Sequence, residues 1–309
     1  MQIYKKLVNN FFYDLIKINY SMHICFKKIE NLYLKIFIFK PKIISTILFI
    51  PFLYLIGWIL AKPISIFSPN NQNISLIGTI ITFSIFIISL PKWFKMRWGL
   101  LNTWALVGVK KNDKRQNLSF YFFKGILYSL FLLLVILIPI LDNNSGNWQG
   151  NVSLNILINA IILVMGIGFA EELIFRGWLF EELKNQFGFK RALIFQALIF
   201  SLVHIGFDMP FWEMTSILSG LFLLGILLAL IRFKDNNSLW GCIGLHGGLV
   251  GGWFLTNNGL VEISNDAPWW LVGPGSVSTN PLGGFVGITL LIVLCFYYLI
   301  RLRLFQTNK

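Results

Sequence analysis

The most restrictive feature of this sequence is a series of apolar segments, several of which run for close to twenty residues with almost no charged side chain. A bilayer core about 30 Å thick is crossed by a helix of roughly 20 apolar residues. The composition agrees, since 56% of the residues are hydrophobic and 13% are charged. The sequence therefore predicts an all-α fold, a polytopic transmembrane helix bundle of about eight spans. The predicted spans are residues 44–61, 74–90, 123–141, 153–178, 191–206, 214–231, 239–255 and 282–300.

The basic residues alternate along the chain in step with these spans. Lysine and arginine are frequent before the first span and after every second one, whereas residues 142–152, 207–213 and 256–281 contain neither. Because basic loops stay in the cytoplasm, we expect both termini there, in an integral protein of the plasma membrane. This distribution explains the net charge of +13 without a nucleic-acid partner.

Residues 1–42 carry lysines among aromatic and aliphatic residues and look unlike a signal peptide. We expect a basic amphipathic arm on the anionic inner leaflet. Residues 43–309 should form one membrane domain, with a catalytic core at about 150–256. The three cysteines, Cys25, Cys242 and Cys295, have no metal-type spacing and are expected to be packing residues.

Residues 170–177, AEELIFRG, place three ionisable side chains inside an apolar segment. Such groups are costly in lipid and usually functional. On a helix, Glu172 and Arg176 lie four residues apart on one face and form an ion pair. Glu171 is rotated by about 100° from Glu172 and has no local partner. We therefore expect Glu172 and Arg176 to be structural and Glu171 to be chemical.

Two histidines fall in other apolar segments. FSLVH at 200–204 puts Phe200 and His204 on one helical face, and GCIGLHGGLVGG at 241–252 carries His246. The helical rise places Glu171 and His204 at about the same depth, and His246 one to two turns shallower. The glycines around His246 let helices approach closely. A glutamate and two histidines on three spans are suited to activating water.

These motifs resemble the type II CAAX prenyl endopeptidase family, also called the CPBP or Abi intramembrane proteases. The family pattern is Glu-Glu-x-x-x-Arg, then Phe-x-x-x-His, then His-x-x-x-Asn or Asp. Here it reads EELIFR at 171–176, FSLVH at 200–204 and HGGLV at 246–250, so Val250 replaces the last polar residue. The motifs cover roughly residues 150–256.

The resemblance implies an intramembrane endopeptidase that cleaves membrane-associated or lipidated peptide substrates. Glu171 would act as general base on a water, His204 would hold or polarise that water, and His246 would stabilise the oxyanion. Glu172, Arg176 and Phe200 would support the site. Because Val250 cannot donate a hydrogen bond, an oxyanion hole here would do without the fourth polar group or recruit another, from backbone groups near the glycines or from Asn257.

Other interpretations stay open on the sequence alone. Glu171, His204 and His246 could ligate zinc, although the chain has no HExxH motif and we expect no tightly bound metal. Intramembrane Glu, His and Arg also line ion and proton routes, as in a coupled transporter. A catalytically inactive relative, acting as a membrane interaction or immunity protein, is the third alternative.

Overall fold

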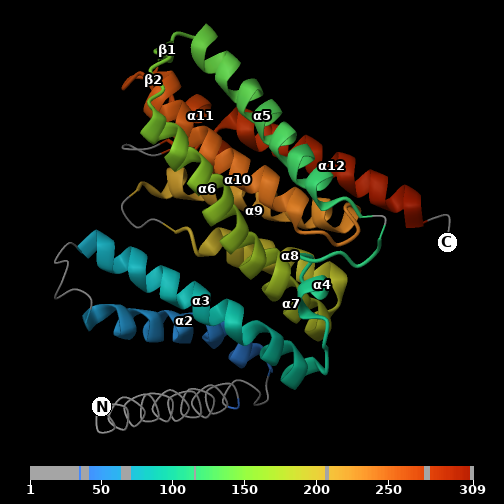
Figure 1. The fold of residues 1–309 in the computed structure, drawn as a ribbon. Helices are drawn as coiled ribbons and strands as arrows, with labels where there is room; N and C mark the ends of the chain where they lie inside the picture. Colours follow the sequence, from blue (N-terminus) through green and yellow to red (C-terminus); the bar gives the residue numbers. More distant parts are fainter. Residues whose placement is uncertain are drawn as a thin grey trace, which may run out of the picture. The chain divides into compact units, whose positions relative to one another are not determined.

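In a computed structural model of the protein, residues 42–63, 71–114, 116–205, 209–274 and 279–306 are described, together with Lys35. The predicted basic arm therefore lies almost wholly outside the described residues. The chain divides into two compact units, residues 1–101 and 102–309 (Figure 1). The predicted division into an arm and one membrane domain stays a prediction.

The described part of the first unit is a pair of packed helices, α2 (Lys42–Ala61) and α3 (Asn71–Trp98). The Phe49 and Trp93 rings stack with centroids 4.1 Å apart. The Arg97 guanidinium lies over the Trp93 ring, 4.8 Å from its centroid, and donates to the backbone carbonyl of Lys42. The basic end of α3 is thus joined to the start of α2.

The second unit contains the remaining elements in chain order. These are α4 (Thr103–Leu106), α5 (Leu118–Asp142), β1 (Gly146–Trp148), α6 (Leu154–Glu172), the π-helical η2 (Leu173–Leu179), α7 (Phe180–Phe187), α8 (Phe189–Leu202), α9 (Phe211–Lys234), α10 (Trp240–Leu255), the π-helical η3 (Thr256–Leu260), β2 (Val261–Ile263), α11 (Trp269–Val272), the 3₁₀ turn η4 (Pro281–Gly283) and α12 (Phe285–Gln306).

The all-α prediction is confirmed, and each of the predicted spans contains a helix. Six helices in the described ranges are long and apolar enough to cross a membrane: Lys42–Ala61, Ile74–Trp98, Leu118–Asp142, Leu154–Phe187, Phe211–Lys234 and Phe285–Leu302. The other two are shorter, since α8 has 14 residues and α10 has 16. At about 1.5 Å per residue, both helices are shorter than a bilayer core is thick.

Helix α10 lies at the centre of the second unit and packs chiefly on α5 and α6 (Figure 1). Its glycines form two faces. A β-carbon at Gly244 would overlap the backbone of α5 at Phe122, and one at Gly247 would overlap the carbonyl oxygen of Val164 on α6. Glycine is therefore required for this close approach. It brings His246, between the two faces, near the end of α6.

Helix α6 exposes large apolar residues and buries small or polar ones, whereas α5 and α9 bury leucine and isoleucine side chains in the core. On α6 the buried residues are Ala160, Gly168 and Glu172, while Ile161 and Ile162 are exposed. This inversion of a soluble protein's pattern is expected where lipid is the solvent, because burying an aliphatic side chain then gains little.

Two short connections complete the frame of the second unit. Strands β1 and β2 form an antiparallel pair with Asn147 opposite Glu262, and they join the segments that follow α5 and η3. The two-stranded sheet was not predicted from the sequence.

An ion pair joins α5 to the end of α9. Lys124 of α5 donates to Asp235, which follows α9. Burial raises the pKa of the Asp235 carboxyl, although the nearby Lys124 lowers it.

Gly247→Ala tests the close approach of α6 and α10. The added methyl group has no space against Val164, so we expect the free energy of unfolding to fall by about 1–3 kcal/mol. Thermal unfolding of the protein in detergent measures this. Gly166→Ala on α6 is the matched control, because a β-carbon there meets nothing within 4 Å. Equal unfolding temperatures for both variants would contradict the packing.

Candidate active site

The two adjacent glutamates stand at the end of α6, where the backbone changes from α-helix to the π-helical η2. A π-helical turn bonds residue i to i+5, as Phe180 N does to Phe175 O. Such wide turns are rare and frequently lie at functional sites. The change from α-helix to π-helix was not predicted, because helical periodicity does not distinguish the two helix types over a single turn.

Glu172 and Arg176 form the predicted ion pair, with Arg176 Nη1 2.8 Å from Glu172 Oε1 and both side chains fully buried. The same carboxylate oxygen also accepts a hydrogen bond from His246 Nδ1 at 2.7 Å. Glu172 is thus more than a local charge partner, because it joins α6 to α10 and orients the imidazole. The sequence reasoning missed this second bond, since Arg176 already satisfied the carboxylate locally.

Glu171 points into a different environment. Its side chain is 28% exposed, and its Oε2 lies 3.8 Å from His204 Nε2 and 3.8 Å from His246 Nε2. That oxygen has no hydrogen-bond partner among the residues that the structure describes. The structure therefore brings together the three side chains that the sequence singled out from separate spans.

His204 lies in a turn just beyond α8, which ends at Leu202 rather than at the predicted residue 206. Its Nδ1 is 2.7 Å from the carbonyl oxygen of Phe200. A carbonyl only accepts, so Nδ1 carries the proton and donates it. This bond fixes the ring with Nε2 facing Glu171.

The Phe200 ring is fully buried at the centre of these groups. Its centroid lies 4.9 Å from that of His204 and 5.7 Å from that of His246, each in an edge-on arrangement. The Arg176 guanidinium lies over the same ring, 4.0 Å from its centroid. One aromatic side chain thus holds both imidazoles and stabilises the buried cation.

A cavity of about 450 Å³, called here the site cavity, opens onto Glu171, His204 and His246. Most of its other walls are apolar and come from α5, α9, α10 and η4. Val250, one turn after His246, lines this cavity, whereas Asn257 lines a second one. Asn257 therefore does not take the place of the polar group that Val250 lacks. The size suits a short stretch of peptide.

The proton positions at the histidines limit what can bind between them. Glu172 accepts from His246 Nδ1, so Nδ1 is a donor in both imidazoles. In the neutral state each Nε2 then presents a lone pair toward Glu171 Oε2. A water has two protons for these three acceptors. A water can therefore form hydrogen bonds with Glu171 and both Nε2 atoms only if one imidazole carries a further proton and donates it to the water oxygen.

Zinc was the alternative occupant. In the described ranges no group of three or more His, Cys, Asp or Glu side chains is arranged to hold a metal ion. The placement of Glu171 and the two imidazoles thus does not form a ready zinc site. The Glu172–His246 bond does resemble the carboxylate that commonly supports a metal-bound histidine.

A second arginine, Arg232, lies in the last turn of α9 and is buried. The alternation of basic residues assigns it to a cytoplasmic loop, which its burial contradicts. Arg232 donates to the carbonyl oxygens of Arg176 and Leu106 and pairs with Glu181 Oε1 at 3.0 Å. Arg232 therefore anchors the π-helical η2 to α9 and α4. Its position in the final turn of α9 resembled a loop flank, which concealed this function.

Comparison with known proteins finds a family model that matches the part of the chain containing the site. A model described as type II CAAX prenyl endopeptidase Rce1-like matches residues 153–251, and this confirms the resemblance seen in the three motifs. A model described as a domain of unknown function (DUF8676) matches residues 25–101. No curated protein and no solved structure matches the chain. With six membrane-length helices in its described part, the chain is an integral membrane protein.

Glu172→Gln tests the buried link between α6 and α10. Loss of the carboxylate leaves the Arg176 charge buried without its partner and weakens the bond to His246. We expect the free energy of unfolding to fall by about 3–5 kcal/mol, measured by thermal unfolding in detergent. Asp142→Asn, on an exposed residue at the end of α5, removes the same charge and should change little. Equal stability of the two variants would show that Glu172 is not a structural centre.

Proposed function

We propose that the protein is an intramembrane endopeptidase, because the type II CAAX prenyl endopeptidase Rce1-like model matches residues 153–251, which contain Glu171, His204 and His246. It would hydrolyse peptide bonds of membrane-associated or lipidated substrates with a water activated by Glu171. The observation that carries the proposal is the position of Glu171 Oε2, 3.8 Å from the Nε2 atoms of both His204 and His246 within one cavity.

In the proposed reaction, Glu171 is the general base. A water donates one proton toward Glu171 and the other toward His204 Nε2, which holds the oxygen in place. Glu171 takes the first proton as the water oxygen attacks the peptide carbonyl carbon. The same carboxyl then gives that proton to the amide nitrogen as the C–N bond breaks, leaving a carboxylic acid and an amine.

His246 is the proposed oxyanion donor. To donate from Nε2 while Nδ1 donates to Glu172, its imidazole must carry both protons. The negative charge of Glu172 compensates the resulting imidazolium, as a buried cation requires. A positioned donor of this kind stabilises the transition state by roughly 3 kcal/mol. Glu172 thus supports catalysis through His246.

The orientation in the membrane is part of the proposal. The loops that contain neither lysine nor arginine, residues 142–152, 207–213 and 256–281, face away from the cytoplasm, and both termini lie inside. The membrane is proposed to be the plasma membrane. The basic loops between the other helices support this orientation, as in membrane proteins generally.

Substitution of the three site residues tests the mechanism. With purified protein and a peptide library, we expect Glu171→Gln to lower kcat by a factor of about 100 to 10,000, because it removes the base without a change of shape. His246→Ala should lower kcat by about 100- to 1,000-fold. Thermal unfolding shows whether each variant is folded. Wild-type turnover in folded Glu171→Gln would refute the mechanism.

The same assay separates the other two interpretations. A wild-type protein that cleaves no peptide in the library would favour an inactive interaction protein, as the apolar Val250 would suggest. Ion flux in proteoliposomes that disappears in Glu171→Gln would favour a transporter.

Removal of metal tests the choice between water activation by glutamate and zinc. We expect activity to persist after exhaustive dialysis against a chelator, and we expect metal analysis of active protein to show less than one zinc ion per chain. Loss of activity that added zinc restores, together with one bound zinc per chain, would establish a metallopeptidase.

A further inference from the structure

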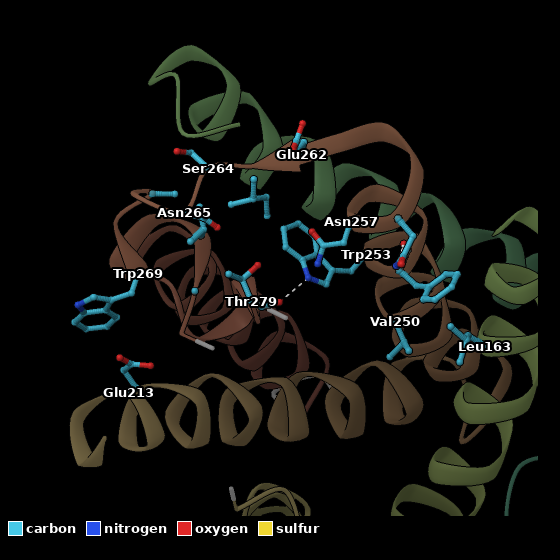
Figure 2. A pocket seen from close by; sticks show the side chains of 16 residues that line it. Leu163, Glu213, Val250, Trp253, Asn257, Glu262, Ser264, Asn265, Trp269 and Thr279 are labelled. Carbon is cyan, nitrogen blue, oxygen red and sulfur yellow. Dashed lines mark hydrogen bonds between the residues drawn. The ribbon is translucent and has the colours of Figure 1, made fainter. Parts of the chain in front are cut away.

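A second cavity, of about 740 Å³, adjoins the site cavity and is not used in the proposed reaction. Its walls come from α9, α10, η3, β2 and α11 (Figure 2). Val250, Trp253 and Thr279 line both cavities, so the two share a wall. A peptide held in the site cavity would therefore lie next to this space, which is called here the acidic cavity.

The charge of this cavity has one sign. Glu213 and Glu262 line it, and no lysine, arginine or histidine is among its lining residues. The carboxylates come from separate walls, the first turn of α9 and strand β2 (Figure 2). Glu213 makes no hydrogen bond or ion pair with another described residue. Glu262 accepts only a neutral donor, Gln149 Nε2, at 2.8 Å. Both negative charges are uncompensated within the described protein.

The remaining lining residues suit an extended peptide with cationic side chains. Trp253 and Trp269 offer indole faces, and an indole face is the best aromatic partner for an ammonium or guanidinium group. Asn257, Asn265 and Ser264 offer hydrogen-bonding groups to a peptide backbone. The Trp253 indole is held in place because its Nε1 donates to the Thr279 carbonyl oxygen at 2.7 Å.

The Thr279 hydroxyl marks the junction of the two cavities. It is buried and has no hydrogen-bond partner among the residues that the structure describes. A buried hydroxyl without a partner is costly, and a ligand group can satisfy it. Since Thr279 lines both cavities, a ligand group that satisfies its hydroxyl lies at the wall that the two cavities share.

The segments expected on the same side of the membrane as the acidic cavity are also negatively charged. The net charge of the chain is +13, yet the segments 142–152, 207–213 and 256–281 contain no lysine or arginine and include acidic residues. The acidic cavity is built largely from the last of these segments. A local negative field in an otherwise basic protein attracts cationic ligands and raises their association rate.

We propose that the acidic cavity binds a lysine- or arginine-containing segment of the peptide substrate, beside the bond that is cleaved at Glu171. The endopeptidase therefore prefers basic peptides presented on the non-cytoplasmic side. This inference rests on the proposed function, because the site cavity supplies the cleavage. It goes beyond that function by naming the chemistry of the substrate and the residues that select it.

Binding to the full-length Glu171→Gln protein tests the proposal without the need for turnover. The probe is a fluorescent peptide rich in lysine, compared with the same peptide carrying glutamine at each lysine. We expect the lysine peptide to bind on the order of tenfold more tightly, and the difference to shrink as salt is raised. Adding Glu213→Gln and Glu262→Gln should remove most of the difference. Glu213→Lys sets one positive charge against that of Glu262, so it should also remove most of the difference.

Asp142→Asn is the matched control, because it removes an exposed carboxylate that does not line the acidic cavity. Equal binding of both peptides, or a lysine preference that survives in the double variant, would overturn the proposal. These results are independent of cleavage. Selective binding by a protein that cleaves nothing would refute the endopeptidase but retain the cation site. Cleavage of both peptides without a preference for lysine would support the endopeptidase but refute the cation site.

Discussion

The second unit depends on one buried carboxylate. Glu172 Oε1 accepts from Arg176 and from His246, and it is fully buried where α6 meets α10. An ion pair in a low-dielectric interior is stabilising only when further hydrogen bonds complete it, and removal of one partner leaves an uncompensated charge. The Phe200 ring and the carbonyl of Phe200 extend the same network to His204. Stability and the geometry of the candidate site are therefore coupled through Glu172.

The glycines of α10 make this network sterically feasible. Gly244 and Gly247 allow the backbone of α10 to approach α5 and α6, so that His246 reaches a side chain at the end of another helix. In lipid the gain from burying aliphatic groups is small, and close packing together with internal hydrogen bonds must hold helices together. Between α6 and α10 the contact is therefore made by small residues, while large aliphatic residues of α6 such as Ile161 and Ile162 face outward.

The sequence predicted what depends on local pattern. Hydropathy located the helices, and four-residue spacing identified the Glu172–Arg176 pair and separated Glu171 from it. Depth along the helices predicted that Glu171 and His204 would meet. The bond from His246 to Glu172 and the burial of Arg232 depend on contacts between distant segments, which spacing along one helix cannot reveal. The π-helical turn and the pairing of β1 with β2 also arise from tertiary packing rather than from periodicity.

Val250 makes the hydrogen bond between Glu172 and His246 more important for the proposed chemistry. An Asn or Asp one turn after His246 would offer a second polar group to the developing oxyanion, and valine offers none. Asn257 lines the acidic cavity and not the site cavity, so it does not compensate. In the proposed reaction the oxyanion must then depend on a charged His246, and a charged imidazole in an apolar wall requires Glu172. Because Val250 supplies no polar group, the proposed stabilisation of the oxyanion depends on His246 and on the Glu172 carboxylate that compensates its charge.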